Sequence, residues 1–377
     1  KVVLQIGYVG SQGHHLFRFV DLDQPSQTVI DSSDLAFANN PSSTDVNGRP
    51  CASLGGTGCI PAYGAPRNFP QFPLSYIFQE QSSAQSNYNA LQTSIRLHDF
   101  RGFQSQVNYV WSHSTDTASD SDDFVPNAAQ PNDSTQPNLE KGNSNFDIRS
   151  RFSWNYMYTL PTWKGKFKML TDGWGVGGSV ILQSGQPFAL NYNFEGDYDG
   201  SAEGDGRPDV TGAPIYNRNN PAQFLNLTTF MVPCTPNPTP SLITPVNNPS
   251  FPVNEQICQP GTRHFGNEGR GSLRGPSFKE GDIAIFKNTP VSERLTAQFR
   301  CEIFNLLNHP NFSSPLLPAF IADAAGGGGI DPSPSSATYG HSLGYLPLTA
   351  TGDVGIGNPF LGGGGPRGIQ FAVKLMF

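Results

Sequence analysis

The amino-acid sequence predicts an all-β fold of long antiparallel strands. Apolar and polar residues alternate in eight stretches of the 377-residue chain, clearly in four of them and more weakly in the other four. Charged residues make up only 14% of the chain, whereas it contains 41 Gly, 33 Pro and 27 Phe. A helical bundle or coiled coil would need far more Ala, Leu, Glu and Lys, and the aromatic content argues against full disorder. The composition therefore agrees with the strands that the alternation predicts.

The first four strands are predicted at 1–9, 88–97, 103–114 and 147–160. The alternation is weaker in the first two of them and clear in the next two. In the third, Val107, Tyr109 and Trp111 share one face and alternate with polar side chains. In the fourth, aromatic residues occupy every second position from Phe152 to Tyr158.

The last four strands are predicted at 173–184, 277–288, 294–306 and 367–377. The first two of these alternate weakly. In the third, Phe299 and Ile303 lie on the face opposite Arg300 and Glu302. In the C-terminal strand, one face is formed entirely by apolar residues, namely Ile369, Phe371, Val373, Leu375 and Phe377.

The connections between these strands alternate between long and short without exception. The short ones are 98–102, 161–172 and 289–293. A transmembrane barrel sorts its connections in this way, because its periplasmic turns are short and its extracellular loops are long. The predicted strands of about 9 to 14 residues also suit a membrane crossing. The sequence therefore predicts part of a transmembrane antiparallel β-barrel in an outer membrane; a soluble β-sandwich is the alternative, but its loops should be shorter.

The two faces of such a wall have different expected roles. Aromatic residues on the apolar face are expected at the membrane interfaces, namely Trp111, Trp154, Tyr156, Tyr158, Trp174 and Phe377. Polar residues on the other face are expected to line the lumen, namely Gln92, Arg96, Gln104, Gln106, Asn108, Arg149, Arg151, Arg300, Glu302 and Lys374. These polar residues either contact material inside the barrel or hydrogen-bond to one another across the wall.

Several segments resemble one family of membrane proteins. They are the corner Tyr8 to Leu16, the segments Tyr88 to Gln92 and Tyr109 to Ser112, the corner Gln183 to Phe188, and the most specific segment, Phe299 to Phe312. Together with the alternating end at Phe377, they resemble the C-terminal barrel of TonB-dependent receptors, in particular Oar-like proteins of the acidobacterial type.

This resemblance implies a barrel of about 22 strands with a plugged lumen. The eight strands here would be roughly its last third, and the plug domain and signal peptide would lie outside this chain. Expected partners are the outer-membrane lipid, the plug and through it TonB, and the barrel assembly machinery, which would read the signal ending at Phe377. The implied function is active uptake of a scarce small molecule, glycan or peptide.

Two other functions remain open from the sequence. One is a passive or adhesin-like outer-membrane barrel whose loops bind surfaces or ligands, and the other is a secreted all-β binding module. A nucleic-acid partner is not expected from a net charge of −7. No nucleophile-elbow, zinc-protease or phosphate-loop motif occurs, so the chain is not expected to be an enzyme.

One acidic run is a weak candidate for calcium binding. Asp197, Asp199, Glu203 and Asp205 are interleaved with glycines, and Ca²⁺ takes six to eight oxygen ligands. A solvated external loop is the favoured interpretation, because the full spacing of a calcium loop is not met. No other metal and no other cofactor is expected.

The five cysteines agree with an exported protein. Disulfides are predicted between Cys51 and Cys59 and between Cys234 and Cys258, because each pair lies within one long external loop. Cys301 lies on the apolar face of a strand and is expected to act there as a small hydrophobic residue.

Overall fold

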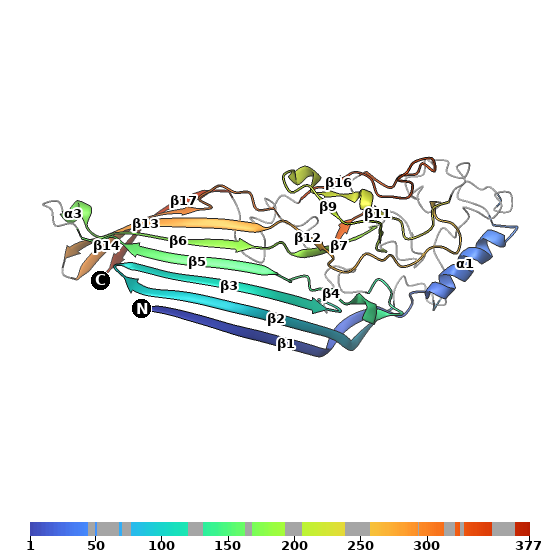
Figure 1. Cartoon of the computed structure of the whole chain (residues 1–377), viewed down its shortest axis with the longest axis horizontal. Coiled ribbons are helices and arrows are strands. Elements are labelled where there is room, and N and C mark those ends of the chain that lie inside the picture. The colour runs from blue at the N-terminus through green and yellow to red at the C-terminus, as the bar shows by residue number, and fades with distance from the viewer. Residues whose placement is uncertain are drawn as a thin grey trace.

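The computed structural model describes residues 1–43, 50, 68–69, 77–119, 131–162, 168–192, 206–237, 257–292, 294–312, 321–324, 328–348 and 366–377. Its main feature is one antiparallel sheet, called the wall below (Figure 1). The wall contains eight long strands in chain order: β1 (Val2–Asp21), β2 (Phe78–Phe100), β3 (Phe103–Asp116), β5 (Ser150–Thr159), β6 (Trp174–Gln183), β13 (Phe278–Ser292), β14 (Leu295–Phe304) and β17 (Gly368–Met376). The short strand β4 (Gly142–Asn143) pairs with the C-terminal end of β3. The prediction of a partial, all-β antiparallel fold is confirmed, and the wall is not closed, since β1 and β17 form its two edges.

The strands β1 and β2 are much longer than the alternation indicates. They stay paired as far as Asp21 and Phe78, so the first long connection is shorter than predicted. Beyond a membrane both faces of a strand can be polar, and the alternation fades while the backbone hydrogen bonds continue. The register shifts between Gly13 and Leu16, where His15 has a φ of 56°. This β-bulge leaves two consecutive histidines outside the regular pairing.

All short connections lie at the end of the wall that also holds both chain termini (Figure 1). The tightest is the turn at Arg101 and Gly102, where Gly102 has a φ of 84°. A Cβ atom at Gly102 would lie 2.5 Å from the carbonyl oxygen of Thr159, so the turn requires glycine. At this end the short helix α3 (Lys168–Thr171) lies between β5 and β6. The long connections all extend from the opposite end.

The described parts of the long connections 184–277 and 305–367 fold together into a second unit, called the cap. Its short elements are β7 (Pro187–Asn191), β8 (Asp209–Val210), β9 (Ile215–Tyr216), η3 (Pro221–Gln223), β10 (Leu225–Asn226), η4 (Leu227–Thr229), β11 (Phe230–Met231), β12 (Leu273–Arg274), β15 (Ile321–Asp323) and β16 (Tyr345–Leu346). They form small sheets around a hydrophobic core that includes Phe188, Leu225, Phe230, Ile257 and Leu346. Most buried apolar side chains of the described residues are in this core and not in the wall.

Two further elements from the other long connections contact the cap or the wall. They are the helix α1 (Gln27–Asn39) and the turn η2 (Pro137–Glu140). No helix among the described residues is long and apolar enough to cross a membrane.

Candidate functional site

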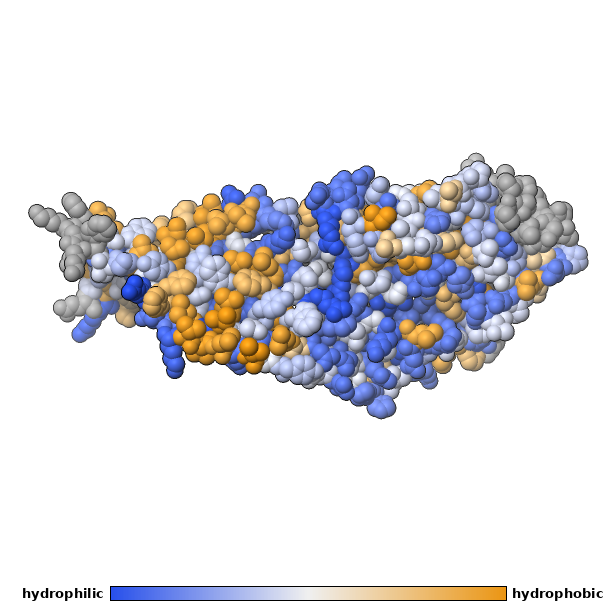
Figure 2. Space-filling view, viewed as in Figure 1, coloured by the Kyte–Doolittle hydropathy of each residue, from blue (hydrophilic) through white to orange (hydrophobic). Residues whose placement is uncertain are grey.

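The outer face of the wall is apolar and exposed. Strand register places Leu4, Ile95, Val107, Trp154 and Val180 in one row across β1, β2, β3, β5 and β6. Large apolar side chains on this face are well exposed, including those at positions 2, 6, 91, 299, 369, 371, 373 and 375. Figure 2 shows hydrophobic residues gathered over the end of the wall near the termini, whereas the other half of the molecule is mainly hydrophilic. A continuous apolar surface of this kind suits lipid and not water.

Aromatic residues mark both ends of this apolar zone. Toward the cap, Tyr8 and Trp111 lie in one row with Leu91, and Trp111 is 60% exposed. Toward the termini, Lys287 Nζ lies 5.1 Å from the centre of the Trp174 ring. Such aromatic residues are typical of the two membrane interfaces. Trp154 lies between the two zones, in the middle of its strand, and not at an interface.

The inner face of the wall is polar. Arg300 and Glu302 both lie on this face and form an ion pair with an Nη2 to Oε1 distance of 2.9 Å. Arg96 and Lys374 lie on the same face of β2 and β17, each in register with a glutamine, and neither contacts that pair. Between β2, β3 and β5, Ser94, Gln106 and Ser153 are linked through Asn108 by hydrogen bonds of 2.9 to 3.3 Å. Arg149 belongs to a bend before β5, where the alternation that predicted a lumen-facing side chain does not apply.

Residues 261–274, called the arginine segment, connect the cap to three other parts of the chain. The first connection is to α1. Arg263 Nε and Nη2 donate to the two oxygens of Asp34 at 3.0 and 2.5 Å, and both side chains are fully buried. Gly261 N also donates to this carboxylate at 3.3 Å. The buried face of α1 consists of Ile30, Asp34 and Ala38, so this pair is part of the helix packing.

The second connection is to the upper end of β3. Arg270 forms an ion pair with the carboxylate of Asp116 and donates to Ser119 Oγ and to the carbonyl oxygen of Glu140, both at 3.0 Å. The carboxylate of Glu140 pairs in turn with Arg207 of the cap. These charges are nearly fully buried, and each has an opposite partner.

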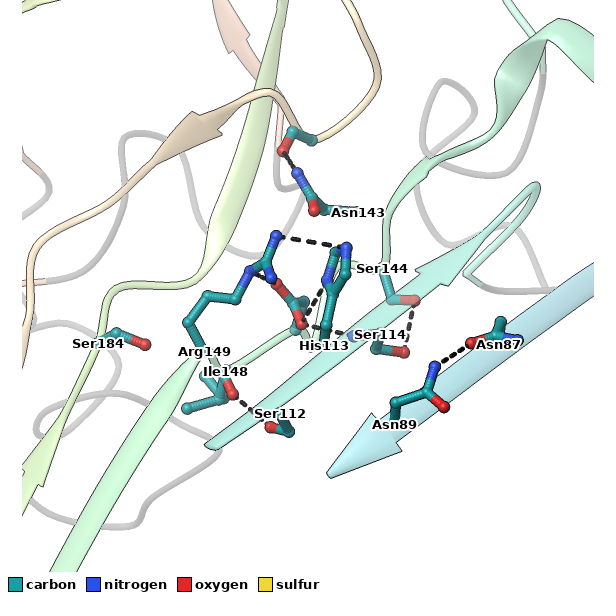
Figure 3. A network of polar contacts seen from close by, with 12 residues as sticks. Asn87, Asn89, Ser112, His113, Ser114, Asn143, Ser144, Ile148, Arg149 and Ser184 are labelled. Atoms are coloured by element: carbon teal, nitrogen blue, oxygen red, sulfur yellow. Dashed lines mark hydrogen bonds and ion pairs between the residues drawn. The ribbon is translucent and has the colours of Figure 1, made fainter. Parts of the chain in front are cut away.

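The third connection is to Asp147, just before β5. Arg274 Nη2 donates to Asp147 Oδ2 at 2.5 Å, and the backbone N–H of Ser114 donates to Oδ1 at 2.7 Å. Figure 3 shows His113 and Arg149 beside one another, with ring and guanidinium nitrogens 3.3 Å apart. Arg149 Nε also forms an ion pair with Asp147 Oδ2 at 3.3 Å. A fully buried carboxylate thus holds the cap to two strands of the wall.

These contacts place the cap over the inner face of the wall, at the end opposite the chain termini. Along β3, Ser112, Ser114 and Asp116 are buried, whereas Trp111 and His113, which alternate with them, are more exposed. The described residues of the cap therefore cover one polar face of the wall. The arrangement can enclose a polar ligand between cap and inner wall, or control access to it.

The arginine segment was missed by sequence reasoning, although it carried a signal. Three arginines within twelve residues are unusual in a chain with only 23 Lys and Arg residues. The segment has no strand periodicity and no motif of catalysis or metal binding, so its sequence predicts only a loop. The carboxylate partners of these three arginines lie 127 to 229 residues away in sequence, so no local pattern reveals them.

Glu268, in the arginine segment, is completely buried and has an altered pKa. Burial raises the pKa of Glu268 from 4.5 to about 7, although the guanidinium of Arg207 and the hydroxyl of Ser272 act to lower it. Oε1 accepts a hydrogen bond from Ser272, whereas Oε2 has no partner among the described residues. The carboxyl group of Glu268 therefore binds its proton more tightly in the folded cap than in the unfolded chain.

We expect this proton to make cap stability depend on pH. Because the folded pKa is the higher one, stability is greatest below about pH 4.5 and falls by about 2 kcal/mol between pH 5 and pH 7. Glu268→Gln keeps an acceptor for Ser272 and should abolish that part of the decline. Hydrogen exchange of cap amides at both pH values measures it. An unchanged pH dependence in the variant would show that another group titrates.

The structure joins Cys234 to Cys258 by a disulfide within the cap, and Cys301 is a free cysteine. The predicted pair Cys51 and Cys59 and the calcium candidates Asp197, Asp199, Glu203 and Asp205 lie outside the described residues. Among the described residues, no group of three His, Cys, Asp or Glu side chains could hold a metal ion.

We expect alkylation of the denatured, unreduced protein to modify Cys301 and not Cys234 or Cys258. Mass spectrometry of the digested protein should then show one peptide pair linked through Cys234 and Cys258. Its matched control is the same sample reduced before alkylation, in which these two residues become modified. Modification of Cys234 without reduction would contradict the disulfide.

The sheet has an apolar outer face with aromatic residues at both ends, a polar inner face, and all its long connections at one end. These features together define the wall of a transmembrane β-barrel. Residues 1–341 match the family described as outer membrane beta barrel domain, and the chain belongs to this family. It is therefore a protein of the outer membrane, and in such barrels the long connections are extracellular.

Other comparisons add little to the family match. No curated protein matches the chain significantly. Among solved structures, it is similar to the outer membrane transporter YddB from Escherichia coli, with 9% sequence identity and a TM-score of 0.38. The similarity covers 100% of this chain and 30% of that chain, so the present chain spans less than a third of the transporter's length.

Proposed function

We propose that this chain is part of a TonB-dependent outer-membrane receptor of the Oar-like kind, which takes up a scarce substrate actively. The observation that carries the proposal is the cap, which buried ion pairs fix over a polar inner wall. A passive pore works best with an open mouth, whereas a receptor that captures a dilute ligand benefits from an ordered surface. The cap is that surface in our proposal.

The wall would then be one section of a larger barrel. The unpaired backbone groups at the outer edges of β1 and β17 would cost several kcal/mol each in lipid. We propose that further strands of the same receptor pair with both edges. The inner-face residues Arg96, Arg300, Glu302 and Lys374 would face the plug domain, and the barrel assembly machinery would read the strand that ends at Phe377.

No catalytic step is part of this proposal. The wall would act as scaffold, the cap would bind the substrate, and energy would reach the plug through TonB. The chemical class of the substrate is left to experiment, with ferric siderophores, glycans and peptides as the classes to compare.

Uptake measured with labelled substrates tests the proposal. Cells producing the receptor should accumulate one member of a panel containing a ferric siderophore, an oligosaccharide and an oligopeptide. Accumulation should fall to background when tonB is deleted or the inner-membrane proton gradient is collapsed. Uptake that continues without TonB would instead support a passive barrel, and surface binding without any accumulation would support an adhesin.

A further inference from the structure

The wall carries a polar hollow beyond the lipid-facing zone, toward the cap end of β1, β2 and β3. Its volume is about 140 Å³, and its lining includes Gln12, His14, Gln85, Asn87, Thr115 and Lys141. Strand register places Gln12, Asn87 and Thr115 in one row on the same face as Tyr8 and Trp111. These three side chains belong to the outer face, whereas Ser86 and Asp116, which also line the hollow, occupy the alternating inner positions. The outer-face residues are those that a ligand from the surroundings of the barrel would meet.

The β-bulge in β1 helps to form this hollow. His14 lies in the unpaired part of the bulge, between Gly13 and Leu16, and its side chain is exposed. Lys141 comes from the other side, just before β4, and is also exposed. A bulge re-aims a side chain relative to the regular pleat, which here directs His14 to the same hollow as Lys141.

The charge of the hollow favours an anion. Lys141 supplies an ammonium group, and amide and hydroxyl groups supply further hydrogen-bond donors. Asp116 also lines the hollow, but its carboxylate forms the buried ion pair with Arg270 described above. Arg149 does not line the hollow, and its guanidinium forms an ion pair with Asp147. No unpaired carboxylate among the described lining residues opposes an anionic ligand.

The height of the hollow indicates where that anion comes from. Gln12 is four positions after Tyr8, which is about 13 Å along the strand. Because strands of such barrels are tilted, this corresponds to about 10 Å along the membrane normal. The headgroup layer on one side of an ordinary bilayer is about 5 to 8 Å thick. The hollow thus lies above simple phospholipid headgroups, at a level that the larger saccharide headgroup of a glycolipid reaches.

A polar ladder leads from the aromatic interface to the hollow. Tyr8 donates from its hydroxyl to Asn89 Oδ1 at 2.5 Å, and Asn89 donates to Asn87, which lines the hollow. These side chains could exchange their mutual hydrogen bonds for sugar hydroxyls. We propose that the hollow binds a phosphate group on the saccharide headgroup of an outer-leaflet glycolipid, and this inference does not depend on the proposed transport function.

Native mass spectrometry of the complete protein in detergent tests this site with lipid A as the probe. The test variant combines His14→Gln with Lys141→Gln. The matched control combines His98→Gln with Lys374→Gln, which removes the same two types of side chain at exposed positions that do not line the hollow. Hydrogen exchange of β1 in each variant verifies that the bulge and its pairing are kept.

We expect the unmodified protein and the control to retain lipid A equally, and the test variant to bind it about fivefold more weakly, the effect of one cation near an anionic surface. Lipid A without its phosphates should bind as weakly as lipid A binds to the test variant. Equal retention by the test variant and the control would overturn the proposal. Displacement of lipid A by millimolar inorganic phosphate would also overturn it, because the site would then bind free phosphate and not a lipid.

Discussion

Replacing Asp34 with Asn is expected to destabilise the attachment of α1 to the cap by about 3 to 5 kcal/mol. Asp34 and Arg263 are both fully buried, and their carboxylate and guanidinium are joined by two hydrogen bonds. The substitution keeps the shape of the side chain but removes its charge, so the buried guanidinium of Arg263 loses the carboxylate that pairs with it. Hydrogen exchange of the α1 amides, in the protein reconstituted into membranes, measures the free energy of opening.

Two further variants separate charge from helix packing. Asp31→Asn changes the same type of residue one turn away, where Asp31 only accepts a hydrogen bond from Gln27 at 2.8 Å, and should change the opening free energy by less than about 1 kcal/mol. Combining Asp34→Asn with Arg263→Met removes both charges and should recover much of the loss. If the double variant were as unstable as Asp34→Asn alone, loss of the carboxylate charge beside Arg263 would not be the cause.

The sequence was sufficient to predict the wall because its signal is local. Phe371 and Val373 alternate with Ala372 and Lys374, and that period of two both defines a strand and assigns its faces. The pairing order could then be predicted as well, since each strand pairs with its neighbour in the chain. The same signal ends where the membrane ends, so the extensions of β1 to Asp21 and of β2 to Phe78 could not be predicted.

The cap could not be predicted because nothing in it repeats. Phe188 and Leu225 belong to strands of only five and two residues, too short for a recognisable period. The contacts that fix the cap join distant charged residues, such as Asp34 and Arg263, and single charges in loops are normally solvated. Only the density of arginines in residues 261–274 indicated that these charges were structural.

The wall itself is most sensitive to charge on its outer face. Val373→Arg is expected to destabilise the protein in bilayers by about 2 to 4 kcal/mol, the cost of an arginine facing lipid near the membrane midplane. Val373 lies in the middle of β17, is 69% exposed, and is in register with Phe299, whose ring stacks on Phe371 at 6.2 Å. An arginine there would have only apolar neighbours on the same face of these two strands.

The inner face of the same strand provides the controls. Gln370→Arg introduces the same side chain in register with Glu302, where a carboxylate and water compensate its charge, and Lys374→Gln removes a charge from that face. Both should change the unfolding free energy by less than about 1 kcal/mol in guanidinium titrations of the membrane-embedded protein. The difference between the two faces, and not the size of any single effect, tests the assignment of lipid and lumen. If Val373→Arg and Gln370→Arg were equally destabilising, β17 would not separate lipid from lumen, and the membrane orientation of the whole wall would have to be abandoned.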